Sequence, residues 1–401
     1  MLSTELASGR VSGRILQSHF YDAALHRAIT ETGTVDVRES LERAAASAAL
    51  AELSAAGRQD SADREITGLL ERTGSGTVER ITAEGDQVEV VLSSSPHAAA
   101  RVEMFGTASA PACDIVRGLI SGCLTAVHGM MYRVEERACL ATGAERCVFV
   151  AVLDPDTPEP EAGSPSAWPE RIAGPPADPA FPPGDVLAPL WAFGDRGISG
   201  ASYGELWGDV YARTAYEFED EVPRQMGAKY ANLASVVLTE AAHLGAFYSL
   251  GGLLRSPEWT GEVAPTLPAR EEWVHAIVAL LDQFGWGAWR IRLLAPEQRF
   301  TVEVHGGFEA RWHLAHHGTA VTPRCHFAKG VVAATMNVVY GGDILGPDSL
   351  DQSLYNLLFR SPLSYRSIET RCMAMGDPHC EFVANPLSAG LRTLSAGLRR
   401  R

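Results

Sequence analysis

The sequence predicts an α+β protein built from two related domains, and three observations support this prediction. Helical stretches are followed by short segments in which apolar and polar residues alternate, the pattern of half-buried β-hairpins. The same order of helix, Gly-x-Gly sequence and hairpin occurs twice along the 401 residues. A proline-rich segment separates the two occurrences, so we expect helices packed on antiparallel hairpins in each half.

The proline-rich segment sets the expected domain boundaries. Ten prolines lie between Asp154 and Pro183, a composition typical of an extended spacer. We therefore expect a first domain over residues 1–153, a linker over 154–185, a second domain over 186–385 and a basic amphipathic tail over 386–401.

The two halves also agree in detail after their hairpins, which read TVERITAEGDQVEVVL and AWRIRLLAPEQRFTVEV. An apolar helical segment follows each hairpin, and it carries a glycine five positions after a cysteine. These glycines are Gly118 after Cys113 and Gly330 after Cys325. The second half then contains an extra segment over residues 343–367, which we interpret as a loop insertion because an added loop costs little entropy.

The charge balance argues against a nucleic-acid partner. The chain has 34 basic and 49 acidic residues and a formal net charge of -15, which repels a phosphate backbone. The N-terminus lacks the charged start and apolar run of a secretory signal, and we find no uncharged apolar stretch of membrane-spanning length. The sequence therefore predicts a cytoplasmic protein.

Six of the seven cysteines belong to a pattern that occurs twice, Glu-x2-Cys-x7-Cys with a further cysteine upstream. Its members are Cys113, Glu136, Cys139 and Cys147 in the first copy and Cys325, Glu369, Cys372 and Cys380 in the second. Three thiolates and one carboxylate complete the tetrahedral coordination of zinc, and a site without an open position is structural. Free cysteine can instead be a small buried apolar residue, and this interpretation holds for Cys123, which has no counterpart. We expect two structural Zn²⁺ ions per chain.

The run CDIVRGLISGCLTAVHGMMYRVEERACLATGAERCVFV, which contains the first copy of the pattern, resembles the end of a 4-vinyl-reductase-type domain. This family includes the sensor region of bacterial transcription activators that respond to phenols, and it is structurally akin to a subunit of the vesicle-tethering TRAPP complex. The resemblance implies a zinc subdomain whose ligands are Cys113, Glu136, Cys139 and Cys147, next to an apolar ligand cavity. With the second copy included, the chain resembles a tandem of two such domains.

The resemblance favours a protein that binds a hydrophobic small molecule and signals through a partner. Two alternatives stay open: a scaffold or assembly protein that uses the paired domains for protein contacts, and an accessory protein in tetrapyrrole vinyl reduction. The sequence shows neither a phosphate-binding loop nor a dinucleotide-binding fingerprint, so an enzyme is less favoured and we assign no catalytic residue.

The second half contains the residues that could line a ligand pocket, although alternation along a hairpin would bury the same residues in a core. A histidine cluster within this set could hold a metal or haem, but no acidic or cysteine ligand accompanies it. The residues are Trp273, Trp286, Trp289, Phe300, Phe308 and Trp312, with His305, His313, His316 and His317 nearby.

The C-terminal segment LSAGLRTLSAGLRRR is a candidate docking element. Its leucines recur at helical spacing with arginines elsewhere, as in an amphipathic helix, although a frayed tail is the alternative. We expect residues 387–401 to contact a protein partner. We also expect the two domains to pair, either within one chain or across a homodimer.

Overall fold

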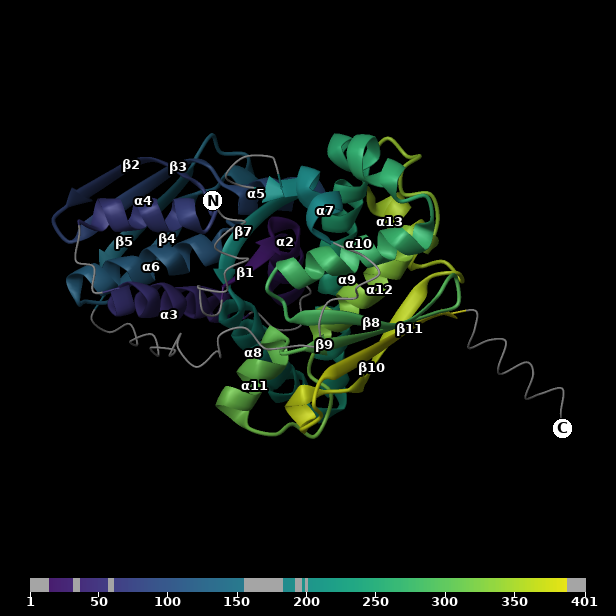
Figure 1. Cartoon of the computed structure of the whole chain (residues 1–401). Helices are drawn as coiled ribbons and strands as arrows, with labels where there is room; N and C mark the ends of the chain where they lie inside the picture. Colours follow the sequence, from purple (N-terminus) through teal and green to yellow (C-terminus); the bar gives the residue numbers. More distant parts are fainter. Residues whose placement is uncertain are drawn as a thin grey trace. The chain divides into compact units, whose positions relative to one another are not determined.

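The computed structural model describes residues 14–31, 37–56, 61–154, 183–191, 197–198 and 201–387 (Figure 1). Most of the predicted linker (154–185) and nearly all of the predicted tail (386–401) lie outside these residues. The chain divides into two compact units, which we call the N-terminal and the C-terminal unit. The N-terminal unit comprises Ser12–Pro169 and Ser202–Val237, and the C-terminal unit comprises Met1–Val11, Glu170–Ala201 and Leu238–Arg401.

The division into units differs from the predicted domain boundary at residue 186. After the proline-rich segment, β7 (Ala201–Trp207) pairs antiparallel with β1 (Arg14–Ser18), and α8 (Gly208–Met226) packs against α3 (Arg38–Ala56). Arg43 of α3 forms an ion pair with Glu217 of α8 at 3.1 Å. Residues 202–237 therefore belong to the N-terminal unit, because their strand and helix find their partners there.

A four-stranded antiparallel sheet in the order β2-β3-β5-β4 forms one layer of the N-terminal unit. Its strands are β2 (Thr77–Glu84), β3 (Gln87–Ser94), β4 (Tyr132–Ala138) and β5 (Cys147–Leu153). The β2–β3 pair is the predicted first hairpin, and it turns at Gly85, whose φ of 59° favours glycine. The remaining helices are α2 (His19–Thr30), α4 (Ala62–Arg72), α5 (Pro96–Phe105) and α6 (Asp114–His128), with the short turn η1 (Leu140–Thr142).

The C-terminal unit contains a sheet with the same strand order, β8-β9-β11-β10. Its strands are β8 (Ala288–Ala295), β9 (Arg299–His305), β10 (Tyr365–Arg371) and β11 (Cys380–Pro386). The helices are α7 (Pro183–Trp191), α10 (Arg270–Gln283), α11 (Phe308–His317), α12 (His326–Tyr340) and α13 (Gln352–Phe359), with the turn η6 (Met373–Met375). Both units therefore combine helices with antiparallel strands, as the predicted α+β class requires.

Corresponding glycines allow two helices to cross closely in each unit. A Cβ atom on Gly118 of α6 would lie 2.2 Å from the carbonyl oxygen of Glu42 in α3. A Cβ atom on Gly330 of α12 would lie 2.4 Å from Cβ of Ala242 in α9 (Ala231–Arg255), a helix that spans the boundary between the units along the chain. Only glycine permits both contacts, which explains why the two apolar segments carry it five residues after their cysteines.

The predicted insertion over residues 343–367 contains a helix, α13, rather than only a loop. The aromatic rings of Tyr355 and Phe359 pack against Phe247 of α9 with centroid distances of 5.4 and 5.8 Å. The Tyr355 hydroxyl donates to the Glu240 carboxylate at 2.7 Å, and Arg360 forms an ion pair with the same carboxylate. The insertion is thus anchored to the C-terminal unit by apolar packing and by charge.

Among the described residues, one helical segment, Ala228–Arg255, is long and apolar enough to cross a membrane by length and composition alone. Of its most apolar stretch, 61% is buried inside the protein. Because a buried core helix meets the same criteria, the segment is weak evidence for a membrane span.

Candidate metal centres and ligand pocket

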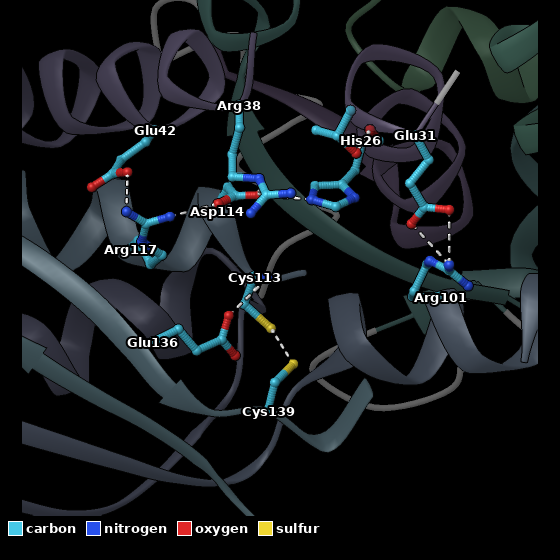
Figure 2. Close-up of polar contacts among 11 residues, drawn as sticks. His26, Glu31, Arg38, Glu42, Arg101, Cys113, Asp114, Arg117, Glu136 and Cys139 are labelled. Atoms are coloured by element: carbon cyan, nitrogen blue, oxygen red, sulfur yellow. Dashed lines mark hydrogen bonds and ion pairs between the residues drawn. The ribbon is translucent and has the colours of Figure 1, made fainter. Parts of the chain in front are cut away.

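The first cysteine cluster gathers its four predicted residues, all of them buried and all with their candidate ligand atoms within 4.8 Å of one another. The sulfur of Cys113 lies 3.8 Å from that of Cys139 and 3.9 Å from that of Cys147 (Figure 2 shows the first pair). Two thiolates bound tetrahedrally to one zinc at Zn–S distances of about 2.3 Å are about 3.8 Å apart. The sulfur spacing is therefore that of a metal site, and all seven cysteines are free of disulfides.

Local backbone structure places these side chains. Glu136 lies near the end of β4, where a register shift follows it, and Cys147 is the first residue of β5. Between them, the tight turn η1 ends at Gly143, whose φ is 90°. The amides of Leu140 and Ala141 donate to the sulfurs of Cys147 and Cys139, each at 3.3 Å, so the turn favours thiolates.

The second cluster repeats this geometry in the C-terminal unit. The sulfurs of Cys325 and Cys380 are 3.5 Å apart, and the backbone amide of Cys325 donates to Glu369 at 3.1 Å. The first cluster has the matching amide contact, from Cys113 to Glu136 at 3.1 Å (Figure 2). Cys372 completes the second cluster, so the insertion between Cys325 and Glu369 leaves the four residues together.

The protonation of the clusters supplies a test of whether a metal fits them. Hydrogen bonds from neighbouring thiols lower the pKa of Cys147 to about 5 and that of Cys372 to about 2. Burial raises the pKa of Glu136 to about 8 and that of Glu369 to about 9. The Oε1 atom of each glutamate is buried and has no hydrogen-bond partner among the described residues. A divalent cation would bind these oxygens and let all four acidic groups of a cluster ionise, so both clusters fit a metal ion.

A network of charged side chains surrounds the N-terminus of α6, next to the first cluster (Figure 2). Asp114, which follows Cys113, contacts His26 at 2.6 Å and Arg117 at 2.8 Å. Arg117 also contacts Glu42 at 2.6 Å, which joins α6 to α3. Sequence reasoning missed this network, because its members come from segments far apart in the chain and the only local signal is an acidic residue at a helix start.

A small pocket adjoins the second cluster, and its walls are mainly aromatic. The Glu309 carboxylate within it accepts hydrogen bonds from the amides of Phe327 at 2.9 Å and Ala328 at 3.1 Å, and burial raises its pKa to about 7. The indole N–H of Trp289 is buried and has no hydrogen-bond partner among the described residues. The lining residues are Trp286, Trp289, Val304, Gly307, Phe308, Glu309, Cys325, Phe327, Ala328, Cys380 and Phe382.

The N-terminal unit has a pocket in the corresponding place, but its lining is polar. His97 precedes Cys113 by the same number of residues as Glu309 precedes Cys325, and each lines the pocket of its unit. The polar lining residues are Asp22, His26, His97, Arg101 and Asp114, with Ala23, Leu41, Ala112 and Ile115 completing the wall. The two units thus offer different chemistry at equivalent positions.

The other aromatic residues and histidines singled out in the sequence have core or surface roles. Trp273 donates its indole N–H to the carbonyl of Leu267 at 3.2 Å, and Trp312 stacks on His316 at 4.4 Å between centroids. Among the described residues, no metal-compatible group includes His313, His316 or His317. His305 instead belongs to a half-buried group with Glu303 and His379 that could hold a metal ion.

Comparison with known proteins identifies one segment. Residues 92–153 match the family model of the 4-vinyl-reductase domain. The matched segment contains the whole first cysteine cluster and His97, and it does not extend to the second copy.

A similar solved structure is the crystal structure of the phenol-responsive sensory domain of the transcription activator PoxR with phenol. It is 14% identical, with a TM-score of 0.34, and the alignment covers 51% of this chain and 90% of that chain. No curated protein sequence matches the chain.

Proposed function

We propose that this protein is a zinc-binding sensor that takes a small hydrophobic molecule into the aromatic pocket of its C-terminal unit and signals through a protein partner. The observation that carries the proposal is the direct contact between this pocket and the second cysteine cluster, because Cys325 and Cys380 belong to both. The 4-vinyl-reductase domain in the N-terminal unit supports the same class of function.

Zinc would be held by Cys113, Glu136, Cys139 and Cys147 in one unit and by Cys325, Glu369, Cys372 and Cys380 in the other. A bound zinc supplies a crosslink, because four protein ligands leave no position for a substrate. In each unit this crosslink ties the start of a helix, α6 or α12, to a strand–turn–strand segment. We therefore assign both zinc ions a structural role.

The pocket lining indicates the kind of molecule that fits. Aromatic walls favour an apolar and preferably planar body. The unpartnered indole N–H of Trp289 is a donor that a ligand oxygen can satisfy, and the Glu309 carboxyl is the acidic group in the lining. The best match is an aromatic molecule that carries one oxygen.

The same contacts supply a route from pocket to metal site. Glu309 lies in the first turn of α11 and holds the first amides of α12, directly after Cys325. Helix α11 also packs against η6, the turn between Cys372 and Cys380. A ligand that shifts Glu309 would therefore move the helix start and the turn that carry three of the four metal ligands. Contact with a partner through residues 387–401, and a cytoplasmic location, stay predictions from the sequence.

Phenol and benzene are the probes that test the proposal, since they differ by one hydroxyl. We expect both to quench or shift the tryptophan fluorescence of the full-length protein, with phenol bound more tightly. Trp289→Phe keeps an aromatic ring and removes the N–H, so it should reduce the preference for phenol by about 2- to 10-fold, the worth of one hydrogen bond. Trp273→Phe is the matched control, because its N–H already has a partner outside the pocket.

Native mass spectrometry of the freshly purified protein completes this test. A co-purifying organic molecule, or saturable binding of either probe that Trp289→Phe weakens, supports the sensor. Absence of any bound molecule together with no saturable binding of phenol or benzene would contradict it and return the scaffold to first place.

A further inference from the structure

A third group of metal-ligating side chains lies in the N-terminal unit, apart from the two cysteine clusters. His19 and Asp22 come from the first turn of α2, and His97 comes from the start of α5, which packs against α2. All three side chains are buried, with 1%, 3% and 4% of their residue surface exposed. One candidate ligand atom from each lies within 4.8 Å of the others.

The free atoms of this group are those that a metal would need. Nε2 of His19, Oδ2 of Asp22 and Nε2 of His97 are buried, and none has a hydrogen-bond partner among the described residues. His97 and Asp22 approach each other at 3.1 Å between Nδ1 and Oδ2. A simple pair between these two residues would account for neither the second buried histidine nor its unpartnered nitrogen. Buried polar atoms without partners are uncommon in folded proteins, and an unseen ion is one accepted cause.

The opposite atoms of the same side chains are held in place. Nδ1 of His19 lies 2.9 Å from the hydroxyl oxygen of Ser202, and Oδ1 of Asp22 accepts a hydrogen bond from the Tyr211 hydroxyl at 2.6 Å. Outer contacts of this kind orient histidine and carboxylate ligands in known metal sites. They leave Nε2 of His19 and Oδ2 of Asp22 as the atoms available to an ion.

The charge state of His19 agrees with this arrangement. Burial, with the neighbouring His97, lowers the pKa of His19 to about 3. The imidazole is therefore neutral at physiological pH and keeps a lone pair for coordination.

We propose that His19, Asp22 and His97 bind a divalent transition-metal ion of the zinc class. Two imidazoles and one carboxylate are ligands that Zn²⁺, Co²⁺ and Ni²⁺ accept. Three protein ligands leave a coordination position open, unlike the four-residue cysteine clusters. The polar pocket lined by Asp22, His97 and Arg101 adjoins the site, so this position is available to water or to a small anionic ligand.

The site is particular to the N-terminal unit within the described residues. At the position equivalent to His97, the C-terminal unit has Glu309, whose carboxylate is bound by two backbone amides. The inference is independent of the proposed sensor function, because it concerns another unit and another set of ligands.

Metal counting on the full-length protein tests the proposal. After equilibrium dialysis against Zn²⁺, we expect three ions per wild-type chain and two in His19→Gln and in His97→Gln. His128→Gln is the matched control, because His128 lies in the same unit and contacts only Tyr132 in the described hydrogen bonds. His305→Gln controls for the half-buried group in the C-terminal unit. Both controls should keep three ions.

Titration with Co²⁺ separates the sites by their ligands. The first two equivalents should develop the charge-transfer absorption of thiolate ligands, and the third should bind without increasing it. Asp22→Asn, which preserves size, should abolish the third equivalent, and metal beyond two equivalents should raise the melting temperature of the wild type but not of this variant.

Several results would overturn the proposal. A wild-type chain that saturates at two ions has no third site. A third ion that persists in His19→Gln and His97→Gln, or that His305→Gln removes, lies elsewhere. If the histidine variants fail to fold, the wild-type titration alone still decides, because a third non-thiolate equivalent without any rise in melting temperature would also contradict binding at a buried site.

Discussion

Replacing Cys147 by serine should unfold the metal end of the N-terminal unit. Cys147 is fully buried, its sulfur lies 3.9 Å from that of Cys113, and it accepts the amide of Leu140 at 3.3 Å. A serine hydroxyl does not ionise near neutral pH, so three ligands would remain. Structural zinc sites contribute about 10–16 kcal/mol of apparent binding free energy in small zinc peptides, whereas a typical domain is stable by about 5–15 kcal/mol. Loss of even half of the zinc contribution would therefore exceed or match the stability of the unit.

Cys123→Ser is the matched control, because Cys123 is equally buried in α6 and belongs to no metal-compatible group among the described residues. It introduces the same hydroxyl and should cost only about 1–3 kcal/mol, the penalty for burying one polar group. Calorimetry of both variants, with elemental analysis of zinc, measures the comparison. We expect Cys147→Ser to lose one zinc and one unfolding transition while Cys123→Ser keeps both. Equal melting behaviour and equal zinc content in the two variants would refute the assignment of Cys147 as a ligand.

Two further predictions concern the packing around the sites. Gly118→Ala should destabilise the N-terminal unit by about 1–3 kcal/mol, because the added Cβ meets the backbone of α3, whereas Gly68→Ala meets only the end of a flexible arginine and should be neutral or stabilising. Thermal melts that rank the two variants the other way would show that α3 and α6 do not cross at Gly118. Burial opposes ionisation of Glu240, but hydrogen bonds from His243 and Tyr355 hold its pKa at about 2, below the ordinary 4.5. Its stabilising effect is present above pH 4.5 and is lost as pH falls towards 2, so wild-type stability should fall more steeply over this range than that of Glu240→Gln, and parallel curves would contradict the anchoring of α13.

The cysteine clusters could be predicted from the sequence because their spacing is local and repeated. A Glu-x2-Cys-x7-Cys run folds as a strand, a turn with glycine in a left-handed conformation, and a second strand. The spacing alone therefore brings Glu136, Cys139 and Cys147 together. Only the upstream cysteine needed longer-range information, and its repetition before both runs supplied it.

Long-range pairing explains what could not be predicted. The strand β1 pairs with β7 across the proline-rich segment, so the boundary at residue 186 was wrong for residues 202–237. His19 and His97 stand far apart in the chain and meet only because α2 packs on α5. The helix within the insertion did carry a signal, since Asp351 is an N-cap residue that accepts the amide of Leu354 at 2.9 Å.

Zinc release during thiol titration tests the central claim most directly. An organomercurial added to freshly purified, chelator-free protein displaces zinc that is bound by cysteine, and a metallochromic dye counts the released ions. If each cysteine cluster holds one zinc, reaction of the six cluster thiols should release two zinc ions per chain, whatever the histidine site contains. Release of one ion per chain or fewer would contradict the paired structural sites on which this account of the protein depends.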